Sequence, residues 1–392
     1  MYPLNCILIT ILLIAILIDK YRKRYYNFHM SKTHKVTVIG AGDRGRAYMT
    51  MLKKYHENDV VISAICDLQD SRNQKAMADF GITTKFSDYK KAITETKPDI
   101  VVVATPAYFH CDIASFAMDN GCNVLTEKPF DLSMEKCFKL KEKQKQTGKS
   151  LAIGLQYRNQ KVNRVIKQIM DKRLIGGNVV MSIFDIRENR PKIAMHDAVY
   201  GNGGPLNDVG CHYYDLMRWY YSSNLKSVSA QWRVDAANRP NIKDAIETKA
   251  PDNGVITAEY ESGDMLLMVI NWSLPTCKAN NFHFSSITGT EGIVLPKEMQ
   301  NYPDVKIISG DKQMTISPDP ADDQDCINPE LGVFDHLVAE IEGQGKVQAS
   351  AEEGILSLAG SMASIRSGVL GRAVTIKEIL DAKPTILECM KK

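Results

Sequence analysis

A glycine-rich turn between an apolar run and an amphipathic segment is the feature that most constrains the fold of this chain. The segment VTVIGAGDRGRAYM places Gly40, Gly42 and Gly45 in a Gly-x-Gly-x-x-Gly pattern directly after the β-branched run 35–40. In that context Gly40 makes a tight turn, Gly42 lets the backbone approach a pyrophosphate and Gly45 lets the helix pack closely on the strand. The first turn of the helix offers free N–H groups to phosphates. A glycine turn without a ligand is the alternative; strand, motif and helix together predict a dinucleotide site, to which Arg44 is also assigned.

Short apolar runs alternate with amphipathic segments from residue 35 to about residue 154. The runs are rich in Val and Ile and contain few polar positions, which is typical of parallel strands buried on both faces. The amphipathic segments between them, such as 110–120 and 133–147, predict covering helices. We therefore expect a doubly wound α/β, or Rossmann, domain at 34–154. The expected strands lie at 35–40, 59–66, 99–104, 123–126 and 151–154.

The pattern changes after about residue 155, where apolar and polar residues alternate with period two. This alternation predicts strands with one exposed face in a mostly antiparallel sheet. The tetrapeptide 261–264, Glu-Ser-Gly-Asp, lies between two such runs and predicts a hairpin turn. Helical spacing returns from 329 to 373, so we expect residues 155–392 to form an α+β domain with an open, mostly antiparallel sheet. The expected strands lie at 177–187, 227–234 and 254–273, and the Pro/Asp-rich segment 317–325 is expected to be a loop.

Polar residues after the next two strands extend the expected cofactor site. Asp67 ends the second strand, where a carboxylate accepts hydrogen bonds from an adenosine ribose and repels a 2′-phosphate, which favours NAD. The alternative is that Asp67 only caps the next helix, and the nearby Arg72 leaves NADP open. Thr105, Pro106 and His110 follow another strand, at the sheet edge where ligands of such folds bind. They are assigned to the cofactor site, although a lone histidine there is more often an ordinary helix residue.

The charged tripeptide Glu127-Lys128-Pro129 follows the apolar run 123–126. A solvated turn between a strand and a helix is the simplest explanation of such a tripeptide. Its place at the end of a parallel strand favours instead a cation held where ligands meet, with Pro129 limiting movement of the backbone. Glu127 and Lys128 are therefore assigned to the cofactor site.

A second constellation occupies the glycine-rich segment 201–219. Asp208, His212 and Asp215 are spaced by four and three residues, so they share one face of a continuous helix. An acid beside a histidine can orient the imidazole and raise its basicity, which suits proton transfer. Two alternatives remain at this point: the three side chains bind a divalent metal ion, or Asp208 caps the helix and the histidine is packed.

The order of these motifs resembles the glucose–fructose oxidoreductase/inositol dehydrogenase/MocA (Gfo/Idh/MocA) family. The motifs are Gly-x-Gly-x-x-Gly, Ala-Thr-Pro-x-x-x-His, Glu-Lys-Pro and Gly-Gly-x-x-x-Asp-x-Gly-x-His-x-x-Asp, and the resemblance covers roughly residues 35–375. It implies a Rossmann domain followed by an α+β domain, with homodimers or homotetramers formed through the open sheet. It also implies hydride transfer between NAD(P) and a secondary hydroxyl or ketone of a sugar, sugar derivative or cyclitol, without a metal ion.

Residue by residue, the resemblance makes Lys128 the catalytic lysine and Asp208 and His212 the aspartate–histidine pair, all three also contacting substrate. Arg158, in the stretch GLQYR, matches a position near the active site and is assigned to substrate binding. The two residues before it follow no single family consensus, so the identity of the sugar or cyclitol stays open. An NAD-dependent glycosidase and a non-catalytic nucleotide-binding regulator share this resemblance, and the presence of the three catalytic residues disfavours the regulator.

The charge and the cysteine content limit the classes of partner and the cell compartment that we expect for this protein. The formal net charge of +3 arises in residues 1–35, which hold six Lys/Arg and one acid, so the remainder is net −2. A slightly acidic body argues against a nucleic-acid partner. Nine cysteines without a C-x-x-C pair indicate reduced thiols and a cytoplasmic enzyme.

The N-terminal segment 1–33 does not belong to either expected domain. Its apolar run Ile7–Ile18 is shorter than the ~20 residues of a spanning helix, and no cleavage signal follows it. Met30 opens a stretch that would equally begin a protein. We expect a dispensable extension; the alternative is a membrane tether with the basic residues on the cytoplasmic side.

Overall fold

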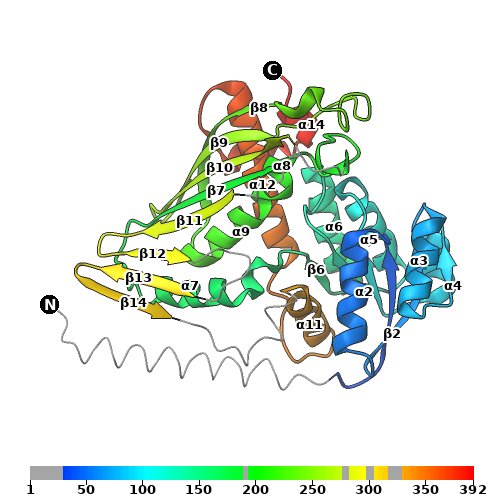
Figure 1. Ribbon diagram of the computed structural model, residues 1–392. Helices are drawn as coiled ribbons and strands as arrows, with labels where there is room; N and C mark the ends of the chain where they lie inside the picture. The colour runs from blue at the N-terminus through cyan, green and yellow to red at the C-terminus, as the bar shows by residue number, and fades with distance from the viewer. Residues whose placement is uncertain (1–29, 189–192, 276–281, 297–303, 317–328) are drawn as a thin grey trace.

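Two β-sheets with helices packed on them make up the described part of the chain, the first built before about residue 155 and the second after it (Figure 1). The computed structural model describes residues 30–188, 193–275, 282–296, 304–316 and 329–392. The run Ile7–Ile18 and the segment 317–325 lie outside these ranges. Inside them, no helix has the length and apolar character needed to cross a membrane. The parallel first sheet and the mostly antiparallel second sheet confirm the expected fold class.

All strands of the first sheet run parallel, in the order β3-β2-β1-β4-β5-β6. The five strands expected from the apolar runs are present, whereas β3 is too short to leave a pattern in the sequence. The strand order reverses between β1 and β4, and ligands of such sheets bind at the carboxyl ends beside this point. The strands are β1 (His34–Ile39), β2 (Val60–Cys66), β3 (Lys85–Phe86), β4 (Ile100–Val103), β5 (Asn123–Thr126) and β6 (Leu151–Ile153).

Helices cover both faces of the first sheet, as the continuous apolar strands predict. On β4, Val101 and Val103 pack in the cluster that contains α5 and α6 residues, whereas Ile100 and Val102 pack in the cluster that contains α2 and α11 residues. All four are fully buried, so each face of the strand has its own core. The helices of this part are α2 (Asp43–Tyr55), α3 (Asp70–Phe80), α4 (Tyr89–Thr96), the short turn η1 (Ala107–Phe109), α5 (His110–Asp119) and α6 (Met134–Thr147).

The second sheet has the order β14-β13-β12-β11-β7-β10-β9-β8-β15, and its neighbours are antiparallel except for β7 and β10. The three expected strand regions are present, and β9 and β10 are joined by the expected hairpin, in which Gly263 has a φ of +87°. The strands after 280 and β15 were not predicted, because each is short and alternates weakly. The strands are β7 (Val180–Glu188), β8 (Leu225–Arg233), β9 (Asn253–Tyr260), β10 (Met265–Leu274), β11 (Phe282–Thr288), β12 (Ile293–Pro296), β13 (Val305–Ser309), β14 (Lys312–Ile316) and β15 (Val374–Thr375).

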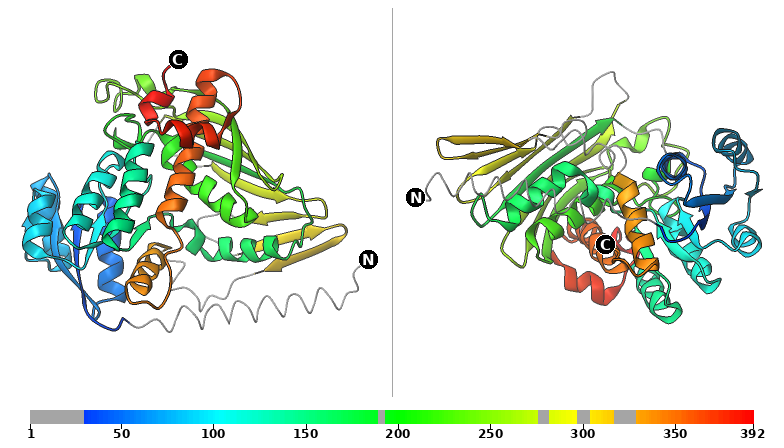
Figure 2. Two further views of the ribbon diagram at one scale, coloured as in Figure 1. Left: turned by 180° about the vertical axis from the view of Figure 1, so that it is seen from behind. Right: turned by 90° about the horizontal axis from the view of Figure 1, so that it is seen from below.

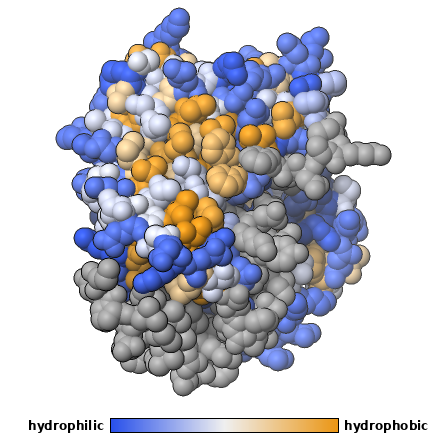
Figure 3. Space-filling model, turned by 60° about the vertical axis from the view of Figure 1, so that its left-hand side comes forward, coloured by the Kyte–Doolittle hydropathy of each residue, from blue (hydrophilic) through white to orange (hydrophobic). Residues whose placement is uncertain are grey.

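Helices pack on one face of the second sheet, and the other face carries exposed apolar side chains. A row of directly paired residues crosses four strands of that outer face: Val255, Val269, Phe184 and Phe284. Val255 and Phe284 at its ends are 51% and 45% exposed. Figure 3 shows apolar side chains gathered on this side of the molecule. The helices and turns of this part are η2 (Gln156–Asn159), α7 (Lys161–Asp171), η3 (Ile193–Met195), α8 (Pro205–Asp208), α9 (Gly210–Tyr221) and η4 (Ala236–Asn238).

Two helices near the C-terminus join the two sheets (Figure 2). Helix α11 (Pro329–Ile341) follows the second sheet in sequence but packs in the core of the first, beside α2. Helix α12 (Ala351–Leu370) contacts α6 on one side and α9 and β8 on the other. Its Gly354 and Gly360 permit this close packing, since an added Cβ would lie 2.8 Å from Phe130 and 2.6 Å from Tyr214. The chain ends with α13 (Ile376–Ala382) and α14 (Ile386–Cys389).

Candidate active site

The glycine-rich turn between β1 and α2 has the geometry of a dinucleotide loop. Gly40 has a φ of +103°, and a Cβ there would lie 2.5 Å from the carbonyl oxygen of Ala104. A Cβ at Gly45 would lie 1.8 Å from the carbonyl oxygen of Gly40, so any side chain would push the helix off the strand. A Cβ at Gly42 meets nothing closer than 3.9 Å, which leaves the start of α2 open. The loop therefore fits a pyrophosphate at the N-terminus of α2.

Asp67 lies beside this loop at the end of β2. One carboxylate oxygen accepts the N–H of Ala41 at 2.8 Å, and the other accepts the N–H of Gln69 at 2.8 Å. The N-cap residue of α3 is Gln69, so Asp67 is not the cap of that helix. Nη1 of Arg72, whose side chain is 49% exposed, is 3.7 Å from Oδ2 of Asp67. An acid and a cation thus lie together where the adenosine end of a dinucleotide would be placed.

The structure buries His110, contrary to the expectation that it contacts a cofactor. Its ring is 1% exposed; Nδ1 lies 2.8 Å from the carbonyl oxygen of Pro129, and Nε2 lies 2.8 Å from that of Thr105. Thr105 and Pro106 do lie at the carboxyl edge of the first sheet, between β4 and η1. His110 therefore holds two loops of this edge together and has no free ring nitrogen for a ligand.

Glu127 and Arg44, both assigned to the cofactor, bind each other. Nη2 of Arg44 donates to Oε1 of Glu127 at 2.8 Å, Tyr48 donates to the same oxygen at 2.9 Å, and Nη1 of Arg44 donates to Glu330 at 2.8 Å. Burial raises the pKa of Glu127, but the charge and hydrogen bonds of Arg44 outweigh it, so the carboxyl is ionised. The Glu127 carboxylate is 2% exposed, so it ties the glycine loop to the Lys128 loop and does not face a ligand.

Lys128 reaches from the first domain to the second. Its Nζ donates to the carbonyl oxygen of Asp208 at 2.8 Å and to the Oδ1 of Asp208 at 3.2 Å. Asn202 donates to that same carboxylate oxygen at 2.8 Å. Burial lowers the pKa of Lys128, but the Asp208 charge outweighs it, and the net pKa lies above its ordinary value. The lysine is therefore an ammonium ion held by two oxygens at the junction of the domains.

The expected contact in which Asp208 would accept a hydrogen bond from His212 is not present, because the helix is interrupted between them. Asp208 is the last residue of α8, Val209 separates the helices and α9 begins at Gly210, so the four-residue spacing does not keep a common face. His212 instead stacks on Tyr157, with ring centroids 4.0 Å apart and planes 4° from parallel. Nδ1 of His212 is buried and has no hydrogen-bond partner in the described part of the chain.

The imidazole of His212 is neutral. Burial lowers its pKa well below 6.5, and the charges of Lys128, Arg44 and Arg187 lower it further. These three cations come from different elements: Lys128 from the loop after β5, Arg44 from α2 and Arg187 from β7. A neutral imidazole beside an ammonium ion can accept a proton while the ammonium stabilises negative charge on oxygen.

Arg158, assigned to substrate from the sequence, is paired with an acid of α9 in this structure. Its Nε and Nη2 donate to the two oxygens of Asp215 at 2.9 and 2.5 Å, and Glu353 lies 3.7 Å away. Asp215 is therefore also unavailable to His212. Within the turn η2, consecutive residues point to different sides, so Tyr157 contacts His212 while Arg158 faces the acids of α9 and α12.

A buried polar cluster on the inner face of the second sheet was missed in the sequence. Asp185 binds Arg187 through two hydrogen bonds, and also accepts the Tyr213 hydroxyl at 2.7 Å and Nε1 of Trp272 at 3.0 Å. His283 lies 3.0 Å from the same hydroxyl. The signal was present: Asp185 and Arg187 occupy inward positions of an alternating strand, where charges are rarely buried without a role. This cluster forms the wall next to Tyr157 and His212.

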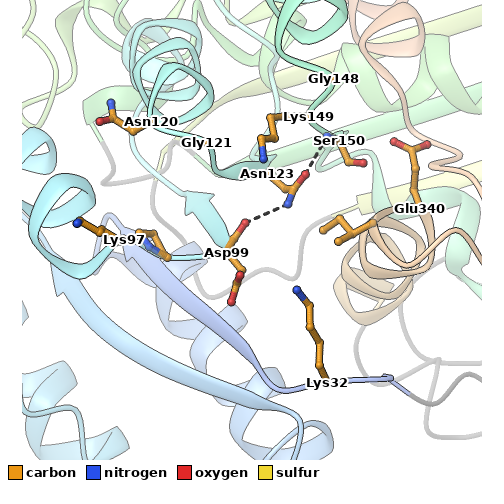
Figure 4. Close-up of a pocket in the computed structure, with 12 residues that line it drawn as sticks. Lys32, Lys97, Asp99, Asn120, Gly121, Asn123, Gly148, Lys149, Ser150 and Glu340 are labelled. Atoms are coloured by element: carbon orange, nitrogen blue, oxygen red, sulfur yellow. Dashed lines mark hydrogen bonds between the residues drawn. The ribbon is translucent and has the colours of Figure 1, made fainter.

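Two other features bear on the choice of site. Among the residues described, no group of three or more His, Cys, Asp or Glu is arranged to hold a metal ion. A polar cleft of about 530 Å³ lies at the opposite, amino edge of the first sheet and mixes Lys32 and Lys149 with Asp99 and Glu340 (Figure 4). It is remote from every motif discussed above, because those motifs follow the carboxyl ends of parallel strands.

The first domain has a parallel sheet with a dinucleotide loop. Helices of the second domain bring Asp208 and His212 to Lys128 of the first. Together these features define a two-domain nucleotide-dependent oxidoreductase. Residues 34–155 match the sequence model described as "Oxidoreductase family, NAD-binding Rossmann fold", and residues 163–295 match that of the "GFO/IDH/MocA C-terminal domain". The chain belongs to the Gfo/Idh/MocA oxidoreductase family, and its first domain is the NAD-binding domain of that family.

Curated relatives and solved structures agree with this placement. The chain is 23% identical over 337 residues to D-glucoside 3-dehydrogenase of Escherichia coli K12, covering 82% of this chain and 92% of the relative. It is 22% identical over 269 residues to inositol 2-dehydrogenase/D-chiro-inositol 3-dehydrogenase of Lactiplantibacillus plantarum, covering 68% and 72%. The structure of levoglucosan dehydrogenase in complex with NADH and levoglucosan superimposes with a TM-score of 0.77 at 17% identity, covering 88% of this chain and all of that one.

Proposed function

We propose that this protein is an NAD(P)-dependent dehydrogenase or reductase that acts on a secondary hydroxyl or ketone of a sugar, sugar derivative or cyclitol. The observation that carries the proposal is the convergence of Lys128, Asp208 and the stacked, neutral His212 beside the NAD-binding edge of the first sheet. The named relatives that act on glucosides and inositols support the substrate class.

The residues that would hold the cofactor are those of the glycine loop and Asp67. The open start of α2 would receive the pyrophosphate, Asp67 the adenosine ribose, and Thr105 with Pro106 would border the nicotinamide end. When bound, NAD supplies the acceptor for the hydride of the alcohol carbon. Arg72 supports use of NADP as well, because its exposed guanidinium lies beside Asp67.

Proton transfer and charge stabilisation fall to different side chains. Lys128, an ammonium ion held by Asp208, would donate a hydrogen bond to the reacting oxygen and stabilise negative charge as it develops. His212, whose imidazole is neutral, would take the hydroxyl proton. Asp208 then acts through Lys128, not through His212. The opposite assignment, with Lys128 as the base, would require this lysine to lose its proton, and the partner Asp208 opposes that loss.

Arg187 is proposed to bind oxygen atoms of the substrate away from the reacting carbon. The oxygens of Asp185 are already occupied by donors from Arg187, Tyr213 and Trp272, so Asp185 orients the guanidinium and is not itself free to accept from substrate. The Trp272 ring packs 4.6 Å from the guanidinium carbon. A fixed cation next to aromatic rings suits a polyhydroxylated ring.

The outer apolar row, Val255, Val269, Phe184 and Phe284, is proposed to pair with the same row of a second copy. An uncovered apolar sheet face is unusual for a monomer, and self-association through one surface yields a closed dimer. A homodimer, or a homotetramer built from it, is therefore proposed, with the cytoplasm as the location, where NAD and reduced thiols occur.

The test is turnover of a panel of cyclitols, hexoses and aminosugars, followed by NADH absorbance with both NAD and NADP. Net NADH formation with at least one member supports a dehydrogenase. Release of an aglycone from glycosides with no net NADH would identify the glycosidase alternative. Binding of NAD without either reaction across the panel would favour the regulator and refute the proposal.

A further inference from the structure

His110 contacts the two loops that border the proposed site, although it lies inside the protein. One ring nitrogen faces the carbonyl oxygen of Thr105, at the end of β4, and the other faces the carbonyl oxygen of Pro129, the residue after Lys128. Both distances are 2.8 Å, and the ring is 1% exposed. The side chain therefore bridges the cofactor loop and the catalytic lysine loop at hydrogen-bond distance on both sides.

The chemistry of the two contacts leaves no other role for the ring. A carbonyl oxygen only accepts hydrogen bonds, so each N–H that the imidazole carries is donated to one of these two loops. In one neutral tautomer the donor serves Pro129; in the other it serves Thr105. Neither nitrogen is left to contact cofactor or substrate, which is why His110 is a positioning residue and not a catalytic one.

A second tie at the same helix turn supports this reading. The N–H of Cys111, the next residue of α5, donates to Oδ2 of Asp131 at 3.2 Å, and Oδ1 of Asp131 accepts the N–H groups of Leu132 and Ser133 at 2.8 and 3.0 Å. The first turn of α5 thus holds the segment after Lys128 at two points, Pro129 and Asp131. Because that segment is anchored there, the Lys128 ammonium can reach across to Asp208.

We infer that His110 carries its proton on Nδ1 and sets the position of Lys128 by donating it to the carbonyl oxygen of Pro129, while Nε2 lies against the Thr105 carbonyl and aligns the cofactor loop by contact alone. The inference rests on the proposed role of Lys128 in turnover. A misplacement of about 1 Å at a catalytic group can cost on the order of 10²-fold in rate. Loss of the Pro129 contact is therefore expected to lower kcat, whereas loss of the Thr105 contact is expected to raise the KM for NAD.

Two amide substitutions separate the contacts. The amide nitrogen of Asn superimposes on the imidazole Nδ1, so His110→Asn keeps a donor for Pro129; that of Gln superimposes on Nε2, so His110→Gln keeps a donor for Thr105. We expect His110→Gln to lose roughly tenfold or more in kcat with little change in the KM for NAD. We expect His110→Asn to retain kcat within a few-fold and to raise the KM for NAD. Equal losses in both variants, or no loss in either, would overturn the inference.

A matched control and a measurement on the unaltered protein complete the test. His56 links α2 to α11 through Asp335 at 2.8 Å and lies away from both loops, so His56→Gln should lower thermal stability without splitting kcat from KM. In the wild type, nitrogen-15 spectra of the histidines should show a ring N–H of His110 protected from exchange, and a freely exchanging ring would contradict the clamp even if the variants do not fold. Absence of turnover in the wild type across the substrate panel would instead refute the proposed function.

Discussion

Nζ of Lys128, on the loop after β5, lies 3.2 Å from Oδ1 of Asp208, at the end of α8. The pair joins the NAD-binding domain to the domain of the open sheet, and both partners are largely buried, with side-chain exposures of 13% and 3%. The ammonium group proposed to stabilise the reacting oxygen is therefore held in place only when the two domains are packed together as they are in this structure.

Replacing Lys128 should abolish most turnover and leave the cofactor in place. Lys128→Met removes the ammonium that stabilises developing charge, so kcat should fall by on the order of 10²-fold or more. The dissociation constant for NAD, measured by fluorescence titration, should change less than about threefold, because Lys128 is not assigned to its phosphates or adenosine. Lys136→Met, which removes an exposed pair with Asp112, is the matched control and should keep wild-type kcat. A Lys128→Met enzyme with near-normal kcat would contradict the assignment.

The pH profile of kcat/KM should be flat over the neutral and mildly alkaline range. Burial holds the pKa of His212 well below 6.5, so the acceptor stays neutral above that pH, and activity should fall only on the acidic side. The Asp208 charge holds the pKa of Lys128 above 10.5, so the ammonium should persist up to that pH. His212→Ala should lose the acidic limb. Activity that instead climbs steadily toward pH 10.5, with the slope lost in Lys128→Met, would make the lysine the base.

Much of the fold and part of this site could be predicted from the sequence, because both depend on local patterns. Continuous apolar runs predict the parallel strands, and the glycine spacing predicts the loop at Gly40. The Asp208–His212 contact was mispredicted because helical spacing holds only on an unbroken helix, and the break at Val209 depends on tertiary packing. The role of His110 was equally hidden, since its partners are backbone carbonyl oxygens, which every residue carries.

The preference between NAD and NADP should depend on two neighbouring side chains. Asp67→Ala removes a charged acceptor for the ribose, so NAD affinity should fall roughly tenfold or more, and NADP affinity should fall less. Arg72→Ala should weaken NADP alone. Asp70→Ala, which removes an exposed acid paired with Lys85, should change neither constant. Equal losses for both cofactors in Asp67→Ala, or tighter NADP binding by the wild type, would refute the assignment of Asp67.

Replacing Arg187 should weaken the binding of substrate and not the binding of cofactor. Arg187→Met should raise the KM for the best sugar or cyclitol of the panel by roughly tenfold, since a charge-assisted hydrogen bond contributes about 1.5–3 kcal/mol. It also leaves Asp185 buried without its counter-charge, so thermal unfolding should be monitored alongside. The double variant Arg187→Met, Asp185→Asn removes the unpaired buried charge. It should therefore recover thermal stability and keep the high KM. Recovery of KM together with stability would mean that Arg187 only supports the fold.

The outer face of the second sheet should decide the oligomeric state. Val255 and Phe284 mark the two ends of the row that runs through Val269 and Phe184, and the rings of Phe184 and Phe284 lie 6.2 Å apart. A chain with Lys at 255 and Glu at 284 would bring like charges together across a two-fold axis only if each residue contacts its own copy. The double variant Val255→Lys, Phe284→Lys brings like charges together in either arrangement, so it is the cleaner test.

With lysines at both ends, burying the row would bring unpaired charges into an apolar interface, and light scattering should show a monomer. Leu370→Lys, at a site 38% exposed at the end of α12, is the control and should leave the mass of the wild-type oligomer unchanged. The NAD-binding domain contains the first sheet, whereas the row lies on the second, so the monomeric variant should bind NAD as the wild type does. A doubly substituted chain that keeps the wild-type mass would show that subunits associate through another surface.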